Sequence, residues 1–214
     1  MSRPKAATFD AQKALIQSMA ATLFAQKGFH NASMAELATL CQVSKPLLYH
    51  YYKDKEEILF DIANAYIERL NEITVSVANK LPQGVERLKA LLAEFMKEYE
   101  HSQSQHIVLI QDMKFLGNQR RQIIIQKQGE VVDQFAATIR ALRPDFASDH
   151  LDKPVTMILF GMINWTFTWL RAEGPLSYEQ MGELATEIFL SGIEGVRRIS
   201  KGANRLTDSV VDVS

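Results

Sequence analysis

The sequence has little of what several classes of protein require. Its 214 residues include a single cysteine, which excludes an intrachain disulfide framework and a cysteine-rich zinc site. Its longest apolar stretch, Val155 to Leu170, has 16 residues, and four polar residues interrupt it. A membrane-spanning helix needs about 20 mainly apolar residues, so we expect a buried helix here and no membrane partner. The first ten residues lack the apolar core of a signal peptide, and the low cysteine content suits the reducing cytoplasm.

The sequence also lacks the alternation of apolar and polar residues that is typical of half-buried strands. Apolar residues recur instead at helical spacing in almost every segment. This pattern predicts an all-α fold with three short helices followed by six longer ones. The last two predicted helices run from about 149 or 154 to 171 and from about 178 to 200. The polar run 101–105 is predicted to be a loop.

Arrangements typical of catalysis are missing as well. No serine, histidine and aspartate stand at a spacing that suggests a triad, and no glycine-rich loop is present to hold phosphates. His101 and His106 are five residues apart, whereas two histidines that share a metal on one helix face are usually four apart. We therefore expect no enzyme activity, no metal site and no cofactor.

Helix-start signals are clear in the first quarter of the chain. Gly28 is a stop signal for the first helix, and Ser33 with Glu36 has the form of a capping box at the start of the second. Ser44 is the expected N-cap of a third helix, where a proline in the first turn costs no hydrogen bond. Asp54 is the expected N-cap of the long helix that follows.

Charge divides the chain into two unlike parts. Residues 1–55 hold seven basic and three acidic residues, a net +4, whereas residues 56–214 hold 17 basic and 22 acidic residues, a net −5. Three short helices with positive charge near the third are the outline of a helix-turn-helix module. The division predicts a DNA-binding domain over 1–55 and a second domain over 56–214.

The third predicted helix carries a specific resemblance. Residues 38–59 read ATLCQVSKPLLYHYYKDKEEIL, which resembles the recognition-helix signature of the TetR family of bacterial transcriptional regulators. The upstream segment AQKGF at 25–29 is also similar. Gln42 stands where the family's turn usually has glycine, and Tyr52 where it usually has phenylalanine. Gln42 must therefore tolerate the backbone angles of a tight turn.

Candidate DNA contacts follow from side-chain chemistry and from this resemblance. Donors that reach phosphate oxygens are expected on Lys45, Tyr49, His50 and Lys55. The resemblance implies phosphate contacts by Tyr49 and Lys55, base-edge contacts by Pro46 and Leu47, and a further contact by Tyr51. Ser33 either faces the DNA backbone or serves only as a cap, whereas Leu48 and Tyr52 are expected in the core. The complete candidate interface is Ser33, Ser44, Lys45, Pro46, Leu47, Tyr49, His50, Tyr51 and Lys55.

The resemblance also implies the architecture of the second domain. In this family it is all-helical, binds a small effector, and dimerises through its last two long helices, so a palindromic DNA operator is implied. We expect a ligand-responsive repressor that its effector releases from DNA. Two alternatives stay open, namely an activator and a helical ligand-binding or protein-interaction module without DNA binding.

Candidate effector contacts are less specific, because methionine and aromatic residues at helical spacing also build cores. Asn164 to Trp169 alternates polar and aromatic residues, a mix suited to an apolar cavity with a few orienting groups. Two arginines at a helix start are either a solvated turn or an anion site. The candidates are Phe95, Tyr99, Met113, Phe115, Arg120, Arg121, Asn164, Trp165, Phe167 and Trp169.

The run from Gly161 to Trp165, with Trp169, is similar to a TetR subgroup that responds to fatty-acyl or aromatic acyl-coenzyme A thioesters. Such an effector would use both the apolar pocket and the arginines at 120 and 121. The resemblance therefore implies a small apolar or acyl-CoA-type effector.

Overall fold

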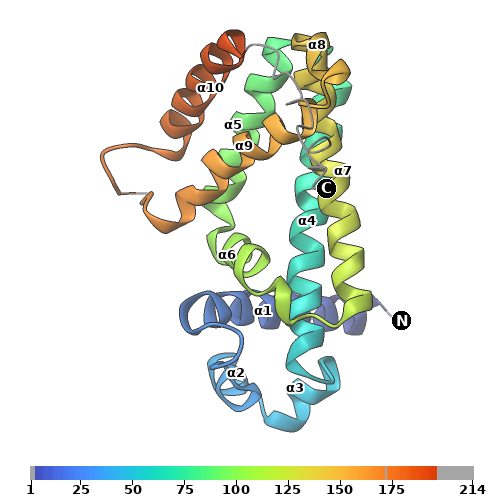
Figure 1. Ribbon diagram of the computed structural model, residues 1–214. Coiled ribbons are helices and arrows are strands. Elements are labelled where there is room, and N and C mark those ends of the chain that lie inside the picture. The colour runs from blue at the N-terminus through green and yellow to red at the C-terminus, as the bar shows by residue number, and fades with distance from the viewer. Residues whose placement is uncertain (1–2, 172, 197–214) are drawn as a thin grey trace, which may run out of the picture.

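The computed structural model describes residues 3–171 and 173–196, with side chains from Phe9 onward, and Figure 1 shows that this part is built from helices. This part of the chain contains ten α-helices, two 3-10 helices and no strand, which confirms the predicted all-α fold. The elements are α1 (Arg3–Lys27), α2 (Met34–Leu40), α3 (Lys45–Tyr51), α4 (Lys55–Lys80), α5 (Val85–His101), α6 (Gln103–Gln111), η1 (Met113–Phe115), α7 (Asn118–Leu142), α8 (Pro144–Ser148), α9 (Asp152–Asn164), η2 (Trp165–Thr168) and α10 (Tyr178–Gly195).

The predicted N-caps of three consecutive helices are confirmed. The hydroxyl oxygen of Ser33 accepts from the backbone N–H of Glu36 at 3.1 Å at the start of α2. Ser44 accepts from Leu47 N–H at 3.3 Å at the start of α3, and Asp54 accepts from Glu57 N–H at 2.8 Å at the start of α4. These bonds satisfy backbone donors that have no partner inside the helix, so they fix where each helix begins.

Several predicted boundaries were wrong. The first helix is not short, because α1 has 25 residues. The segment 101–105 is not a loop, since α5 continues to His101 and α6 starts at Gln103. Ser102 alone separates the two helices, and its hydroxyl donates to Glu98 Oε1 at 2.6 Å. Polar residues such as serine and glutamine can form the outer, water-facing side of a helix, so a polar run does not by itself indicate a loop.

The later helices also differ from the prediction. The short helix α8 was missed between α7 and α9. α9 ends at Asn164 rather than at 171, because residues 165–168 tighten into the 3-10 helix η2. Within this segment the hydroxyls of Thr166 and Thr168 donate to the backbone carbonyls of Ile163 and Trp165. The predicted end of the last helix at 200 lies outside the described residues.

The first three helices form one end of the molecule, with α2 and α3 below α1 in Figure 1. α4 begins beside α3 and, at 1.5 Å per residue, carries its 26 residues about 39 Å away from that end. α7 runs alongside α4, and α5 packs on α4 and on α10. α6 contacts both α1 and α4, so it lies between the first region and the rest of the chain.

Aromatic residues lie at the centre of the core of the larger region. The ring of Phe95 on α5 lies 5.0 Å from that of Phe135 on α7, and Phe135 lies 4.9 Å from Phe160 on α9. Phe95 and Phe135 are fully buried. In the first region Leu48 and Tyr52 are buried, which confirms their predicted place in the core.

Candidate nucleic-acid interface and effector cavity

The turn before α3 sets the direction of that helix. Gln42 has φ of +55°, in the left-handed region that favours glycine, so the predicted backbone demand at this position is confirmed. The backbone N–H of Val43 donates to the carbonyl of Ala38 at 2.9 Å and closes the turn. Pro46 lies in the first turn of α3, where its missing N–H leaves no hydrogen bond unmade.

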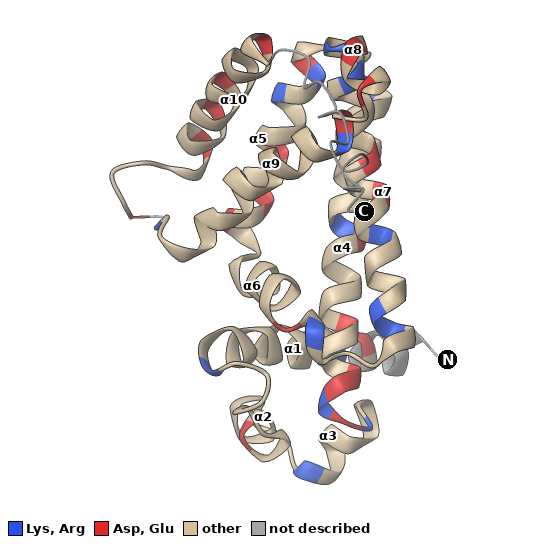
Figure 2. Cartoon of the chain, in the orientation of Figure 1, with Lys and Arg blue, Asp and Glu red and all other residues tan. Residues whose placement is uncertain are grey.

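α3 presents one exposed face and buries the other. Leu48 is buried against the core, while Tyr49 is 52% exposed and Leu47 is 41% exposed. Six of the nine candidate DNA contacts lie together on this exposed side and at the helix start, namely Ser44, Lys45, Pro46, Leu47, Tyr49 and His50. Figure 2 shows α3 at one end of the molecule, with Lys and Arg positions, coloured blue, at its start and in the segment that follows it. Exposed donors beside a helix N-terminus are what phosphate binding requires.

Tyr51 is held differently from its neighbours on α3. It is half-buried, and its ring stacks on Phe9 of α1 with centroids 4.6 Å apart. His50 meets the same two rings edge-on, at 5.7 Å from Tyr51 and 6.2 Å from Phe9. Phe9 was missed by the sequence analysis, because it precedes the apolar pattern of α1, which starts at Leu15. The stack fixes the side of α3 on which Tyr51 and His50 lie.

Lys55 is turned inward in this structure. Its ammonium donates to the backbone carbonyls of Phe29, His30 and Ala32, the last at 2.7 Å. A lysine has three donors, so this position leaves none for the predicted phosphate contact. Burial lowers the pKa of Lys55, and the nearby charge of Asp112 opposes that effect. In this structure Lys55 holds the turn between α1 and α2 against the start of α4.

Ser33, the remaining candidate, is exposed and caps α2. Its oxygen accepts from Glu36 N–H, while the carboxylate of Glu36 pairs with Lys27. The capping box is therefore half formed: the serine bond is present, and the return bond from Glu36 to the cap is replaced by an ion pair. The hydroxyl proton of Ser33 stays free to donate to a phosphate oxygen, so capping and DNA contact are compatible.

The larger region contains an inner chamber of about 260 Å³ between α4, α5, α6, α7 and α9. Phe95, Tyr99 and Asn164 line it, as three of the predicted effector contacts. His106 and Gln128 are polar lining residues that the sequence analysis did not select. The rest of the lining is Ile67, Leu70, Leu109, Ile110, Val131, Val132, Met157 and Phe160.

Three polar residues of this lining, Tyr99, His106 and Asn164, are linked to one another and to the buried Tyr66. Tyr99 Oη donates to Asn164 Oδ1 at 2.6 Å, and Tyr66 Oη lies 3.2 Å from His106 Nδ1. His106 Nε2 lies 3.5 Å from the carbonyl of Asn164, and the rings of Tyr99 and His106 are 4.0 Å apart. Burial lowers the pKa of His106 to about 4, so the imidazole is neutral at pH 7.

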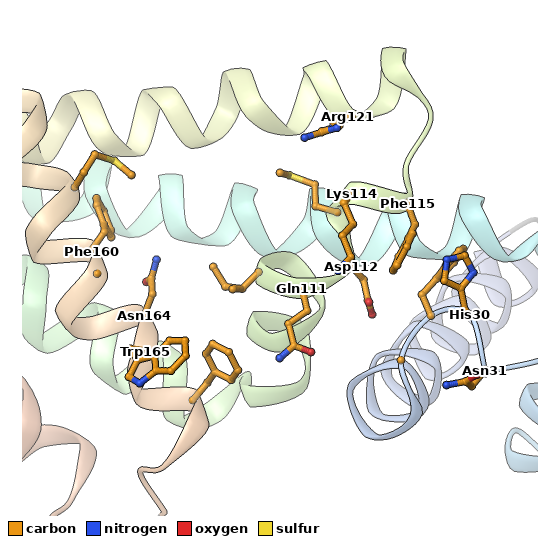
Figure 3. A pocket seen from close by; sticks show the side chains of 17 residues that line it. His30, Asn31, Gln111, Asp112, Lys114, Phe115, Arg121, Phe160, Asn164 and Trp165 are labelled. Atoms are coloured by element: carbon orange, nitrogen blue, oxygen red, sulfur yellow. The ribbon is translucent and has the colours of Figure 1, made fainter.

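An outer groove of about 900 Å³ adjoins the inner chamber and is larger and more polar (Figure 3). Five predicted effector contacts besides Asn164 line it, namely Met113, Phe115, Arg121, Trp165 and Phe167. Figure 3 shows Arg121 from α7 on one side, with Asn164 and Trp165 of the α9 segment on the other. The opposite end is formed by Gly28, Phe29, His30 and Asn31, which belong to the turn between α1 and α2. The outer groove therefore touches both regions of the molecule.

Two predicted effector contacts lie outside both spaces. Arg120 Nη1 is 3.2 Å from Glu56 Oε1, which also accepts from Gly117 N–H, so Arg120 joins α7 to the start of α4. Trp169 is 49% exposed and follows η2, and it lines neither space. Trp169 lies beyond η2 and does not continue the face of α9 that points into the cavity, whereas Trp165 and Phe167 of η2 still line the outer groove.

The junction between the two regions is aromatic. Phe115 of η1 stacks on Phe29 with centroids 5.6 Å apart, and its ring lies 4.1 Å from that of His30. Asp112 is buried beside them, and burial raises its pKa. Because these residues also line the outer groove, a ligand in the groove would meet the contact through which α6 and η1 hold the α1–α2 turn.

Two further features are absent from the described residues. No cluster of three histidine, cysteine or carboxylate side chains there could hold a metal ion. No helix among the described residues is long and apolar enough to cross a membrane.

Family comparisons match both regions of the chain. The model described as "Bacterial regulatory proteins, tetR family" matches residues 16–62. The model described as "Tetracyclin repressor-like, C-terminal domain" matches residues 82–193, which is more than half of the chain.

Comparison with individual proteins also finds similarity to transcriptional regulators. A crystal structure of a TetR-family transcriptional regulator from Bordetella parapertussis is 31% identical, with a TM-score of 0.80, and the match covers 86% of this chain and 97% of that one. The transcriptional repressor KstR2 of Mycobacterium tuberculosis is 25% identical over 187 residues, 83% of this chain and 92% of the relative. The structure of AibR with isovaleryl coenzyme A and operator DNA shares the fold, with a TM-score of 0.72 at 23% identity, over 83% of this chain and 97% of that one.

Proposed function

Because this chain belongs to the TetR family of bacterial transcriptional regulators, we propose that it is a homodimeric repressor that a coenzyme A thioester releases from its operator. The chain is a DNA-binding regulator, and its relatives include named repressors. The observation that carries the effector proposal is the inner chamber of apolar walls joined to the outer groove with basic side chains. The site of action would be the cytoplasm, where the operator is.

We assign DNA reading to residues 1–55 and effector sensing with dimerisation to residues 56–214. The exposed side of α3 supports the first assignment, since Lys45, Tyr49 and His50 offer donors there. Leu47 is exposed among them and suits contact with a thymine methyl group in the major groove. The net charge of +4 on residues 1–55 favours approach to phosphates. Lys55, which holds the α1–α2 turn, would act on DNA through the position of that turn.

An apolar face on α9 and α10 supports the homodimer. Ile158 is 63% exposed and Ile188 is 54% exposed, and Leu184 is exposed as well. Side-chain atoms added at Gly192 or Gly195 would meet open space, so a partner helix could approach closely there. Exposed apolar area of this kind on two adjacent helices is typical of an interface. Two reading regions related by twofold symmetry would bind a palindromic operator.

The two joined spaces match the two halves of an acyl-CoA. The inner chamber of about 260 Å³ is lined mainly by apolar side chains, which suits an acyl group. The outer groove offers Arg121 and Lys114 for the phosphates of coenzyme A. AibR, which shares this fold, has been crystallised with isovaleryl coenzyme A and operator DNA, and this supports the same ligand class here.

Release would work by a shift between two dimer conformations. An effector in the outer groove would contact both α9 and the α1–α2 turn, beside the stack of Phe29 and Phe115. A ligand that favours one position of this turn moves α3 relative to its copy in the dimer. DNA affinity then falls by as much as the ligand prefers the released conformation.

A release assay tests the proposal. Operator fragments are first selected from random DNA by the wild-type protein, and binding is then followed by fluorescence anisotropy. Free acids, coenzyme A and acyl-CoA thioesters are added in parallel at equal concentration. We expect thioesters to release the DNA at micromolar concentration and free acids to leave it bound. Retention of DNA with every thioester would contradict the effector class, while absence of any selected DNA would contradict operator binding itself.

A helical module without DNA binding, the alternative raised by the sequence, has no observation in its favour. Residues 16–62 match the family model of bacterial regulatory proteins of the tetR family, and Lys45, Leu47, Tyr49 and His50 on α3 are exposed. The relatives are transcriptional regulators, so no enzymatic reaction is proposed.

A further inference from the structure

The inner chamber and the outer groove meet at a neck. Four residues line both spaces, namely Ile110, Met157, Phe160 and Asn164. Three of them are apolar, so Asn164 supplies the one polar side chain at the neck. Figure 3 shows the Asn164 side chain projecting from the end of α9 into the cavity, between Phe160 and Trp165.

The amide of Asn164 is held in one orientation. Its Oδ1 accepts from Tyr99 Oη at 2.6 Å, and Tyr99 is buried against His106. This bond occupies the acceptor end of the amide. Among the residues that the structure describes, the Nδ2 group of Asn164 has no hydrogen-bond partner. A fixed donor therefore faces the cavity and is ready for an acceptor on a ligand.

The chemistry of an acyl-CoA determines which of its groups would lie at the neck. Its acyl chain suits the apolar inner chamber, and its pantetheine arm and phosphates suit the outer groove. The thioester group joins these two parts, and its carbonyl oxygen is a neutral acceptor. The neck itself carries no charged side chain among its four shared residues, so a neutral carbonyl fits better than a free carboxylate.

We propose that Asn164 Nδ2 donates a hydrogen bond to the thioester carbonyl of the effector, and that Tyr99 orients Asn164 for this contact. The inference rests on the proposed acyl-CoA effector and adds the residue that distinguishes a thioester from other coenzyme A derivatives. Tyr99 is a positioning residue, since its hydroxyl is directed to the asparagine rather than to the ligand. Loss of one neutral hydrogen bond corresponds to about a tenfold change in affinity.

The test compares two ligands that differ at one group. Octanoyl-CoA has nine non-hydrogen atoms in its acyl group, and S-octyl-CoA carries a CH₂ in place of the carbonyl. Binding of both to the full-length protein is measured by calorimetry. We expect wild type to prefer octanoyl-CoA by about tenfold, and Asn164→Leu to bind both ligands equally, at the affinity of wild type for S-octyl-CoA.

Further variants separate recognition of the thioester carbonyl from an effect of the side chain on the shape of the cavity. Asn164→Asp keeps an acceptor for Tyr99 but removes the donor, so it should favour S-octyl-CoA. Gln128→Leu is the matched comparison, because Gln128 lines only the inner chamber, and it should change both affinities together. Tyr99→Phe should reduce the preference without abolishing it. Operator binding without ligand reports that each variant is folded.

Three outcomes would overturn the inference. The first is a wild type that binds both ligands equally. The second is an equal loss of both ligands in Asn164→Leu, which would indicate a role in cavity shape alone. The third is no binding of either ligand to wild type, which would overturn the acyl-CoA effector together with this contact. The first two leave the proposed effector class intact, so the two failures are distinguishable.

Discussion

Polar side chains serve opposite purposes in the reading region (residues 1–55) and the sensing region (residues 56–214). On α3 the polar groups are exposed, and local hydrogen bonds that Ser44 and Asp54 accept from backbone N–H groups fix the starts of α3 and α4. In the sensing region Tyr66, Tyr99 and His106 are buried, and they bond to one another or to Asn164 across four helices. Local capping thus orients groups for a charged polymer, whereas long-range packing orients groups for a small ligand.

The two regions meet along α1, which packs on α4 and α6. At the α1–α2 turn, Phe29 and His30 contact Phe115, and Lys55 holds the same turn against α4. We propose that a change inside the cavity reaches α3 through this turn, because α3 makes its own contacts mainly with α2. Variants in either region should therefore separate DNA contact, stability and effector response.

The largest effect is expected from two neighbouring leucines on α3. Leu48 is fully buried, so Leu48→Ala should lower the free energy of unfolding by about 2–5 kcal/mol through the cavity that it leaves. Leu47 is 41% exposed, so Leu47→Ala should leave stability nearly unchanged and alter base preference in the selected operator. Urea unfolding and DNA selection are the two measurements. Equal destabilisation by both changes would place Leu47 in the core.

The next effect depends on pH. Burial lowers the pKa of His106 to about 4, whereas an unfolded histidine titrates near 6.5. Between these values the unfolded chain binds the extra proton, so stability is fully present above pH 6.5 and falls as pH falls toward 4. The loss should reach about 3 kcal/mol at the lower end. Urea unfolding from pH 7 to 4 measures it, and His106→Phe should have a shallower dependence. Parallel curves for the two proteins would contradict a buried neutral imidazole.

The exposed face of α3 should give a smaller free-energy change that is confined to DNA binding. Replacing both Lys45 and Tyr49 by alanine would remove two of the proposed phosphate contacts in each protomer, so operator affinity should fall by about tenfold or more. The dependence of the binding constant on salt should also become shallower, by about one unit for each lysine lost. Anisotropy titrations between 50 and 300 mM salt measure both quantities. Wild-type affinity in the double variant would mean that another surface reads the operator.

The smallest effect is expected at the turn before α3. Gln42 has φ of +55°, so Gln42→Gly should relieve backbone strain and stabilise the protein by about 0.5–1 kcal/mol. Gly28 has φ of +78° with open space around it, so Gly28→Ala is the matched opposite change and should destabilise by a similar amount. Thermal unfolding measures both shifts. A Gln42→Gly protein less stable than wild type would show that the glutamine side chain stabilises the turn.

Sequence reasoning worked best where structure is local. The caps at Ser33, Ser44 and Asp54 depend on residues three apart, so they were visible in the sequence and are confirmed. The buried positions of Leu48 and Tyr52 followed from the same register. The family resemblance rested on this segment too, and the comparisons match it.

The cavity could be predicted only in part. Aromatic candidates such as Phe95 and Tyr99 line the inner chamber, but His106 was considered only as a possible metal ligand. Its partners Tyr66 and Asn164 are 40 and 58 residues away, and no local pattern reveals such contacts. Trp169 was wrongly grouped with Asn164, because the change from α-helix to 3-10 helix after Asn164 leaves no mark in the apolar spacing.

The central claim is that occupation of the sensing cavity controls the reading helix. Val132 lines the inner chamber and is half-buried, so Val132→Trp should fill that chamber without touching α3. The decisive measurement is operator release by octanoyl-CoA, followed by anisotropy in wild type and in this variant. We predict that both proteins bind the operator equally and that only wild type is released. Release of the filled variant at the same octanoyl-CoA concentration would contradict the account.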